Sequence, residues 1–597
     1  MRVLACALLI IACGGRDAAA QAPTAATLYN EVREVLDRTT AQWAGMLTPT
    51  GVFQNPFAAD VVRGNHSFVP PMLAYSVHRS GERIGDPTLV AAAERAWPHA
   101  VSASRASAFD MVGAAYAYRN LALSDERRTQ LATYMSVYGI PLNGYICILR
   151  PSCYGNLKLV DALAVLSITG AGIRAADPAM RLGKPALARA HAARIVNKRI
   201  GKVVDHGLRA RLPGVRVRGS YLSDPTANPV AYHGLSAFML SEAVRELGPS
   251  ASPAARRASR ETMDALAVLV APDGDLSYLG RGQDQAWVPG LVAGALASGA
   301  RDAAATHPAR AGRYLAAARR AVERLATLHA GPQGLQLVPG AAVRTTAAGI
   351  DHYAHTVAYN GLALFGLTVA LDALAAIPTA EIGALASEHR LVVRDSAASG
   401  LGIVADGAGW LAVHRHADTD DLRFDFGALA LKRRTPQGWI DLLAPRPHVP
   451  LAYNTGGPGL LRRGQPLLPG DEKLLVPGGE KIRVRRRTLT VHGGYREGDR
   501  WIRRVRFRWR LTRTGARLSV RGARRGDRFR MLAYTPTGTG KLKRHALVTA
   551  GARWHFDRPI ESARLPGYHS AAIENLDALE ARFTAPWSGR FVVTIGA

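Results

Sequence analysis

The hydrophobic period of the chain changes once, and this change restricts the folds open to it. From about residue 25 to 378, apolar residues recur at spacings of three and four, as in "RYLAAARRAVERLATL" (Arg313–Leu328), which is typical of amphipathic helices. After about residue 388 they alternate with polar residues, as in "RFDFGALALKRR" (Arg423–Arg434), between Gly-rich turns. This order predicts a helical domain followed by an antiparallel β-sandwich.

The helical segments, roughly a dozen in number, come in pairs of unlike character. "SPAARRASRETMDALAVLV" (Ser252–Val270) carries charges, whereas "AWVPGLVAGALASGA" (Ala286–Ala300) is small and apolar. Such pairs suit a half-exposed outer layer and a buried inner layer. We therefore predict a multidomain α then β chain, with an (α/α) toroid of helical hairpins over 23–387 and the sandwich over 388–597.

One nine-residue phrase, V-A-Y-x-G-L-x-x-F, occurs at Val230–Phe238 and again at Val357–Phe365. A looser copy begins at Ala286. We predict that each copy opens an inner helix, that its Gly permits close helix packing, and that equivalent helix ends face one opening. The variable letters, His233 and Asn360, would then point into a shared cleft. The alternative is that both residues only satisfy buried helix ends.

Helix starts and the loops before them are rich in His, Tyr, Asn and Arg but poor in carboxylates. A glycoside hydrolase normally needs two carboxylates, for which Asp284 and Asp275 are the candidates. β-Elimination at a uronate needs instead an amide or Arg to neutralise the sugar carboxylate, a His or Tyr base and a Tyr acid. The remaining candidate residues fit the second set better: Asn156, Tyr232, His233, Tyr278, Arg281, Gln283, Trp287, His352, His355, Tyr359 and Asn360.

Two stretches carry a resemblance to a known family: "HTVAYNG" (His355–Gly361) and "GSYLSDPTANPVAYHG" (Gly219–Gly234). With the predicted architecture, they resemble the exported polysaccharide lyases of the hyaluronate, chondroitin AC and xanthan lyase type, whose plan heparinase and alginate lyase relatives share. The tryptophan-rich Asn motif of that family is absent, and Asn156 lies in "YGNLKL" instead.

The reading that follows is a lyase acting on a uronate-containing polysaccharide. Asn156 would neutralise the carboxylate with help from Arg281 and Gln283, and His233 would be the base, with His355 as its rival. Tyr232 or Tyr359 would be the acid. The other expected substrate-binding residues are Tyr278, Asp284, Trp287, His352 and Asn360. The alternatives are a toroid hydrolase using Asp284 and Asp275 and a non-catalytic glycan-binding envelope protein. His352 and His355 have a spacing that could hold a metal, but we expect no metal and no other cofactor.

The net charge is +30, and only nine of the 76 basic residues are Lys. Residues 481–530 hold 19 basic and three acidic residues, a net charge of +16. In "RVRFRWRL" (Arg504–Leu511) the arginines, Arg506 and Arg508 among them, would face away from the apolar residues. We interpret this face as a track for an acidic polysaccharide, with a solvated surface as the alternative, and we expect no nucleic-acid partner.

The N-terminus has the pattern of an export signal. Arg2 precedes the apolar run "VLACALLIIAC", and small residues up to Ala22 offer cleavage sites. Residues 1–22 are therefore predicted to be a signal peptide of a secreted or periplasmic protein, with a lipid anchor at Cys13 as the alternative. Export favours a disulfide between Cys147 and Cys153. We expect a monomer, and no apolar run beyond the signal long enough to span a membrane.

Overall fold

The computed structural model describes most of the chain outside its first 22 residues. The described residues are 23–53, 69–101, 107–136, 138, 155–173, 185–200, 204–222, 224, 230–280, 282, 284–331, 334–335, 356–383, 392–394, 400–416, 426–445, 457–463, 472–568, 573 and 575–597. The predicted signal peptide, the Cys13 anchor, the Cys147–Cys153 disulfide and the domain boundary at 387/388 lie outside these residues and stay predictions.

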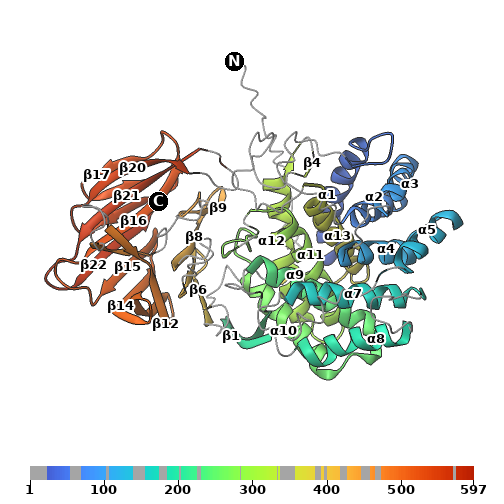
Figure 1. The fold of residues 1–597 in the computed structure, drawn as a ribbon, viewed down its shortest axis with the longest axis horizontal. Coiled ribbons are helices and arrows are strands. Elements are labelled where there is room, and N and C mark those ends of the chain that lie inside the picture. Colours follow the sequence, from blue (N-terminus) through green and yellow to red (C-terminus); the bar gives the residue numbers. More distant parts are fainter. Residues whose placement is uncertain are drawn as a thin grey trace, which may run out of the picture.

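The described α-helices form two layers, as the paired periodicity predicts (Figure 1). Six inner helices contact one another in order and close a ring: α2 (Pro70–Ile84), α4 (Ala108–Asn120), α7 (Gly155–Gly170), α9 (Val230–Leu247), α11 (Trp287–Ala304) and α13 (Thr356–Ala375). Each has an outer partner: α3 (Pro87–Ala100), α5 (Asp125–Ser136), α8 (Pro185–Arg194), α10 (Pro253–Leu269), α12 (Pro308–Arg324) and α1 (Ala25–Gly45), respectively. The helical region is thus a toroid of hairpins.

Glycines of the repeated phrase let the inner helices approach closely. A Cβ atom at Gly290 of α11 would lie 2.6 Å from the Cα of Ala363 in α13, and one at Gly294 would lie 2.5 Å from the carbonyl oxygen of Gly366. A Cβ at Gly234 of α9 would lie 2.9 Å from Val292. Contacts this short exclude any side chain. The prediction that the shared Gly serves helix packing is therefore confirmed.

Helix α13 corrects one expectation from the sequence. Its window Ala358–Ala375 is long and apolar enough to cross a membrane by length and composition, although no such run was expected beyond the signal. However, 89% of this window is buried inside the protein. Because α13 packs against α11, α2 and α1, it is apolar on nearly every side, so α13 is a core helix.

A β-hairpin interrupts the helical region, which the periodicity alone did not predict. Strands β1 (Val204–Leu212) and β2 (Val215–Leu222) pair antiparallel, and β1 also pairs with β5 (Val392–Arg394). The hairpin thereby joins a sheet whose other strands come almost two hundred residues later. One face of the hairpin packs on α10, where Gly219 approaches Ala265.

The β region consists of antiparallel sheets, as predicted, with one sheet more than a simple sandwich. A seven-stranded sheet has the order β2-β1-β5-β6-β7-β8-β9, with β6 (Leu401–Ala405), β7 (Gly409–His414), β8 (Gly427–Thr435) and β9 (Gly438–Asp441). An eight-stranded sheet runs β12 (Pro477–Arg485), β13 (Thr488–Glu497), β14 (Arg500–Leu511), β15 (Gly515–Arg521), β22 (Arg590–Gly596), β19 (Arg553–Phe556), β18 (Ala546–Val548) and β17 (Lys541–Lys543). A five-stranded sheet runs β11 (Glu472–Leu475), β10 (Gly459–Arg463), β16 (Arg528–Pro536), β21 (Leu576–Thr584) and β20 (Glu561–Tyr568). A short pair, β3 (Ala330–Gly331) and β4 (Gly334–Leu335), stands apart from the sheets.

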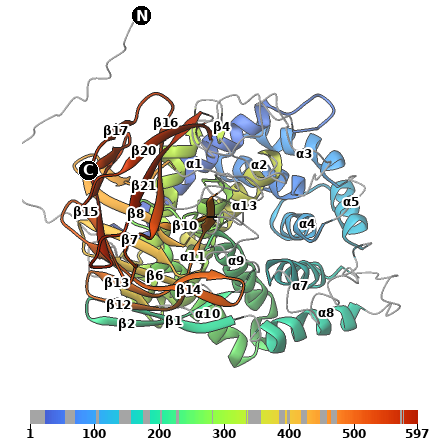
Figure 2. The same ribbon diagram turned by 60° about the vertical axis from the view of Figure 1, so that its left-hand side comes forward.

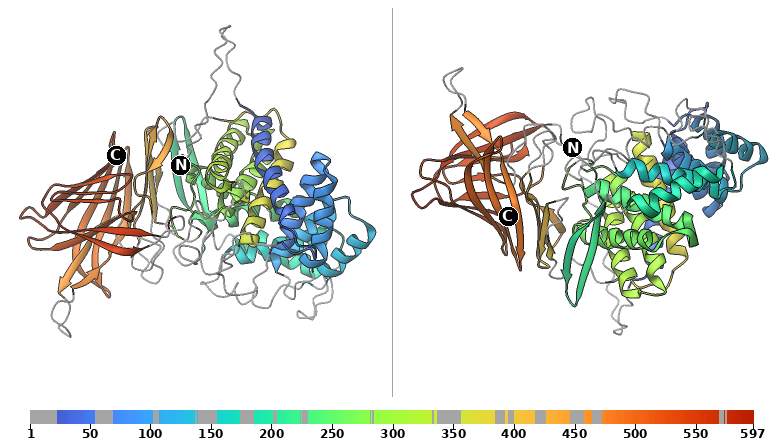
Figure 3. Two further views of the ribbon diagram at one scale, coloured as in Figure 1. Left: turned by 90° about the horizontal axis from the view of Figure 1, so that it is seen from above. Right: turned by 60° about the horizontal axis from the view of Figure 1, so that its bottom comes forward.

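The seven-stranded sheet lies between the toroid and the other two sheets (Figure 3). Ile403 and Trp410 belong to the apolar core shared with the helices, whereas Val404 and Leu411 belong to the core shared with the other sheets. Both faces of this sheet are therefore buried, which explains why β6 and β7 read as continuous apolar runs.

Candidate functional site

Three predicted aromatic residues meet where inner helices begin. Tyr232 lies in the first turn of α9, Trp287 opens α11, and Tyr359 lies in the first turn of α13. The Trp287 ring is 5.4 Å from the Tyr232 ring and 5.8 Å from the Tyr359 ring. The prediction that equivalent ends of inner helices face one another is thus confirmed for these three helices. All three rings are buried, and the two tyrosines each bring a polar hydroxyl group into the cluster.

His233 is packed into the interior and does not face an open cleft, which corrects the sequence-based expectation. Its ring is fully buried and stacks on Tyr221 at 4.4 Å. Its Nδ1 accepts a hydrogen bond from the backbone N–H of Leu222 (3.0 Å). Burial lowers the pKa of His233 to about 3. A ring already engaged through Nδ1 and so weakly basic is a poor general base, and its evident task is to hold the end of β2.

Asn360, in the second copy of the phrase, has the complementary role. It is fully buried, and its Nδ2 donates to the backbone carbonyl of Leu335 in β4 (2.8 Å). Each variable letter therefore satisfies a backbone group of the strand that covers its helix. His233 accepts from an N–H group, and Asn360 donates to a carbonyl group. Both contacts are structural, as the alternative to a cleft role supposed, but the partners are strand backbone groups and not helix ends.

Two other candidates occupy buried positions. Asn156 lies in the first turn of α7, only 6% exposed, and its Oδ1 accepts from the Leu157 N–H (2.6 Å). Tyr278 donates its hydroxyl to the carbonyl of Leu269 (2.9 Å) and packs edge-on against Trp410 of β7. Tyr278 is therefore part of the contact between toroid and sheet, a structural position that the sequence did not indicate.

Four candidates, Arg281, Gln283, His352 and His355, lie outside the described residues, so their roles stay predictions. Within the described part of the chain, no group of three His, Cys, Asp or Glu side chains could hold a metal ion. Near Arg281 and Gln283, the described residues Gly280, Gly282 and Asp284 all adopt left-handed backbone conformations with positive φ angles. Gly282 itself packs on Trp287 and Ala231, beside the aromatic cluster.

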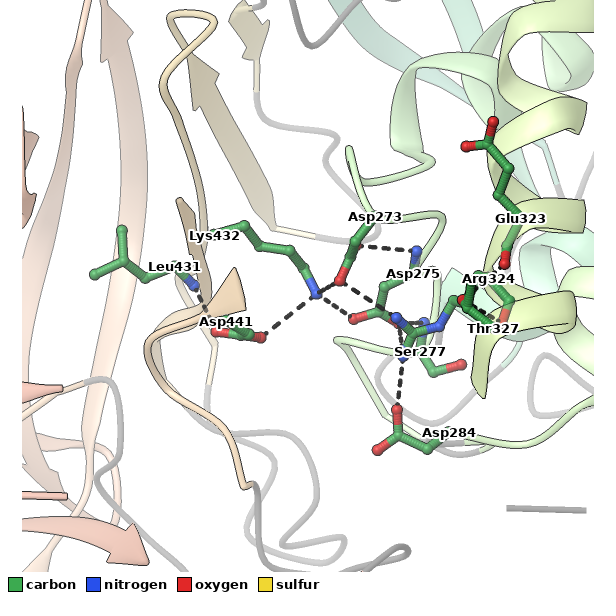
Figure 4. Close-up of polar contacts among 10 residues, drawn as sticks. All are labelled: Asp273, Asp275, Ser277, Asp284, Glu323, Arg324, Thr327, Leu431, Lys432 and Asp441. Atoms are coloured by element: carbon green, nitrogen blue, oxygen red, sulfur yellow. Dashed lines mark hydrogen bonds and ion pairs between the residues drawn. The ribbon is translucent and has the colours of Figure 1, made fainter. Parts of the chain in front are cut away.

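Asp284 and Asp275 are both held in ion pairs (Figure 4). Arg324, at the end of α12, binds Asp284 (2.8 Å), Asp273 (3.3 Å) and Asp275 (3.8 Å). Asp275 is buried, whereas the Asp284 side chain is 39% exposed. A hydrolase needs one carboxylic acid and one carboxylate flanking a sugar. Carboxylates paired with one buried guanidinium group do not offer that arrangement.

Lys432 of β8 extends this network to the β region, and no sequence pattern indicated this role. Its Nζ binds Asp273 (2.7 Å), Asp275 (2.9 Å) and Asp441 of β9 (3.5 Å). Burial alone would lower the pKa of Lys432, but these carboxylates outweigh it and the pKa is raised. We call the set Asp441, Lys432, Asp273, Asp275, Arg324 and Asp284 the interdomain ion chain.

Asp110 is a second residue that the sequence reasoning missed. Burial raises its pKa to about 6. It accepts from the N–H and hydroxyl groups of Ser107 and from the N–H of Val69, the residue before α2 (2.5 Å). The spacing Ser-x-x-Asp is the signature of a capping box and could have identified it. Its contacts tie the start of α4 to the start of α2.

Figure 2 shows the β1–β2 hairpin beside the strands β12, β13 and β14. A basic groove of about 1340 Å³ lies between them. We call it the arginine groove. Eleven arginines line it: Arg209, Arg211, Arg216, Arg218, Arg483, Arg485, Arg486, Arg487, Arg506, Arg508 and Arg510. None of its described lining residues is a carboxylate.

The predicted alternation of β14 is confirmed in this groove. Phe507 and Trp509 are buried in the core, whereas Arg506 and Arg508 are exposed on the opposite face. The groove is strongly cationic: partial burial and then the charges of Arg506, Arg483 and Lys481 lower the pKa of His492. The arrangement suits a polyanion.

Strand β2 connects the arginine groove to the helix ends. Arg216 and Arg218 line the groove, and Leu222, at the other end of the strand, contacts His233 beside Tyr232. Leu222 lies four positions beyond Arg218, a span of about 13 Å in an extended strand. Strand β2 therefore runs from the arginine groove to buried residues beside the aromatic cluster.

Comparison with known proteins finds similar solved structures, at low sequence identity. No family model and no curated protein matches the chain. Among solved structures, it is similar to a chondroitin AC lyase from Streptomyces coelicolor A3 in complex with chondroitin sulphate (12% identity, 98% of this chain and 81% of that chain, TM-score 0.49). It is also similar to a heparinase III (10% identity, 95% and 84%, TM-score 0.43). An unsaturated glucuronyl hydrolase from Streptcoccus agalactiae matches 60% of this chain and 93% of its own (12% identity, TM-score 0.40).

Proposed function

We propose that the protein is a polysaccharide lyase that cleaves a uronate-containing anionic glycan by β-elimination. The observation that carries the proposal is the arginine groove, whose described lining holds eleven arginines and no carboxylate, and which lies one strand's length from the helix-end aromatic cluster. A polyanionic chain held in the groove would pass within reach of hydroxyl and amide groups. The carboxylates that hydrolysis would use are engaged by Arg324 and Lys432.

The proposed reaction assigns each step to a group of the chain. A base takes the proton from C5 of the uronate, and the electron pair forms the C4–C5 double bond. The C4–O bond to the leaving sugar breaks, and an acid protonates that oxygen. Tyr232 or Tyr359 is the proposed acid, and Asn156 with Arg281 and Gln283 would neutralise the sugar carboxylate. His355 replaces His233 as the proposed base, because His233 is buried and engaged through Nδ1.

Ultraviolet absorbance tests the proposal directly. Incubation with alginate, hyaluronan or chondroitin sulfate should produce the unsaturated uronate chromophore at the same rate as new reducing ends. Tyr359→Phe or Tyr232→Phe, whichever residue is the acid, should lower kcat by roughly 10²–10⁴, the worth of a positioned acid. Tyr29→Phe, on the outer helix α1, is the matched control and should leave kcat unchanged.

Two outcomes would contradict the proposal in different ways. Reducing ends without the chromophore would indicate a hydrolase. Tight binding without either product would indicate a glycan-binding protein, for which the same groove is the supporting observation.

A further inference from the structure

Arginines stand directly opposite arginines on neighbouring strands in both sheets that border the arginine groove. The hairpin pairs Arg209 with Arg218 and Arg211 with Arg216. The eight-stranded sheet repeats the arrangement in three further pairs: Arg506–Arg521, Arg510–Arg517 and Arg521–Arg590. Like charges directly opposite each other destabilise an antiparallel pair. The paired arginines therefore repel each other in the folded protein, and a bound polyanion would reduce this repulsion.

Many of the exposed arginines on this part of the protein are not neutralised by a carboxylate of the described residues. Seven exposed arginines form no ion pair with any residue in the part of the chain that the structure describes: Arg483, Arg485, Arg506, Arg508, Arg510, Arg517 and Arg521. The start of β14 differs, because Arg503 binds Asp527 (2.7 Å) and Arg504 binds Glu480 (3.2 Å). Along β14, charge compensation thus stops where the groove begins, although Arg487 of the groove lining forms an ion pair with Asp406.

The pairing register sets the spacing of the unpaired charges. Arg506, Arg521 and Arg590 occupy the same row on three consecutive strands. Neighbouring strands are about 4.8 Å apart, which is close to the length of one pyranose ring in an extended polysaccharide. Along β14, Arg506, Arg508 and Arg510 recur every second residue, about 6.6 Å. A chain lying across the strands therefore meets one arginine about every sugar.

The exposed arginines of β14, β15 and β22 form what we call the arginine face: Arg506, Arg508, Arg510, Arg517, Arg521 and Arg590. We propose that the arginine face binds glycans with a negative charge on every sugar more tightly than glycans with a charge on every second sugar. The inference rests on the proposed function only in taking the ligand to be an anionic glycan. A chain charged at alternate sugars leaves every second guanidinium group of a row facing its neighbour without an anion. A chain charged at every sugar compensates the whole row.

Binding of two carboxylate polymers tests the selection. Alginate carries one carboxylate per sugar and hyaluronan one per two sugars, so oligosaccharides of equal length from each are compared with the full-length protein by calorimetry. Absorbance of the unsaturated uronate is followed during the titration, so that cleavage of the ligand is detected and the concentration of intact ligand is known. Alginate should bind roughly ten-fold tighter or more, and its slope of log Kd against log salt should be about twice that of hyaluronan, because the slope counts released counterions. Equal slopes, or a steeper slope for hyaluronan, would overturn the proposal.

A variant outside the groove lining tests the face itself. Arg517→Gln with Arg521→Gln should narrow the difference between alginate and hyaluronan and raise Tm without ligand, because like-charge pairs are removed. Arg38→Gln with Arg257→Gln, on exposed helix positions, removes the same charge and should leave the difference intact. If the two double variants show the same difference in Kd between alginate and hyaluronan, the arginine face is not the source of the selection.

Two further outcomes separate the possible failures. Single-stranded DNA binding as tightly as alginate at equal charge concentration would overturn the assignment to glycans. Selection of alginate without any unsaturated product would overturn the lyase activity but support the inference. Cleavage of both polymers with equal salt slopes would support the lyase activity but overturn the inference.

Discussion

The backbone N–H of Leu222 donates a hydrogen bond to Nδ1 of His233 at 3.0 Å, so the last residue of β2 is fixed to the first turn of α9. Both residues are buried, and Tyr221 stacks on the His233 ring. This contact positions a strand that begins in the arginine groove and ends at the helix-end cluster. His233 therefore connects the two parts of the site through structure and not through proton transfer.

His233→Ala should lower the free energy of unfolding by about 2–4 kcal/mol, because it leaves a cavity and an unsatisfied buried N–H group. Urea denaturation at pH 7.5 measures the change. The exposed His307 provides the control, since His307→Ala should cost less than about 0.5 kcal/mol. A stable His233→Ala protein with kcat reduced a hundred-fold or more would restore His233 as the base.

The same residue predicts a pH dependence of stability. Burial lowers the pKa of His233 to about 3 in the folded protein, against about 6.5 in the unfolded chain. The unfolded chain then binds the extra proton, so the contribution of His233 is complete above pH 6.5 and is lost as the pH falls toward 3. The loss approaches about 1.4 kcal/mol per pH unit. His233→Asn keeps an acceptor but does not titrate, so the wild-type protein should lose more stability than this variant between pH 6.5 and 5. Parallel curves would contradict the assignment.

Local patterns predicted the elements of this fold better than they predicted its site. The two layers of helices and the alternation of β14 follow from side-chain periodicity, which is a property of neighbouring residues. The hairpin β1–β2 was missed because its sheet partners, β5 to β7, are nearly two hundred residues away. His233 was read as a cleft residue because nothing nearby in sequence shows that Leu222 covers it.

The two variable letters of the repeated phrase show the same limit. Leu222 presents a donor and Leu335 presents an acceptor, so one copy needs a ring nitrogen that accepts and the other an amide that donates. The sequence reveals that the letter differs, but only the covering strand explains which letter is needed. The same holds for Lys432, which looks like one more basic residue until Asp273 and Asp275 are placed beside it.

Charge reversal in the arginine groove should weaken polymer binding selectively. Arg506→Glu with Arg508→Glu should raise KM for a long anionic polymer by roughly ten-fold or more and leave KM for a short oligosaccharide nearly unchanged, because only the polymer reaches the groove. The effect should shrink at high salt, since exposed charges are screened beyond about 8–10 Å. Steady-state kinetics at low and high salt measure it. Arg38→Glu with Arg257→Glu is the control, and an equal change for both substrates would indicate a merely solvated face.

Gly290→Ala should destabilise the toroid by about 1–3 kcal/mol, the usual cost of overpacking. The new Cβ atom would lie 2.6 Å from the Cα of Ala363, so α11 and α13 would have to separate. Thermal unfolding measures the loss. Gly45→Ala is the matched control, because nothing lies within 4 Å of its added Cβ and the change should be neutral or slightly stabilising. Equal Tm values for the two variants would show that the helix contact is looser than the structure indicates.

Lys432→Met should destabilise the protein by about 3–5 kcal/mol at pH 7, because it leaves Asp273, Asp275 and Asp441 around an apolar side chain without their shared cation. The loss should shrink as the pH falls, the same direction in which the contribution of His233 is lost. The attraction between Lys432 and these carboxylates exists only while they carry negative charge. The wild-type protein therefore loses this attraction at low pH, and its advantage over the variant decreases. Urea denaturation at pH 4.5, 5.5 and 7 should show the deficit shrinking toward low pH. Lys481→Met, on the exposed face of β12, removes the same charge and should show no such trend. A deficit of constant size would mean that packing around Lys432, and not its charge, holds the seven-stranded sheet to the toroid.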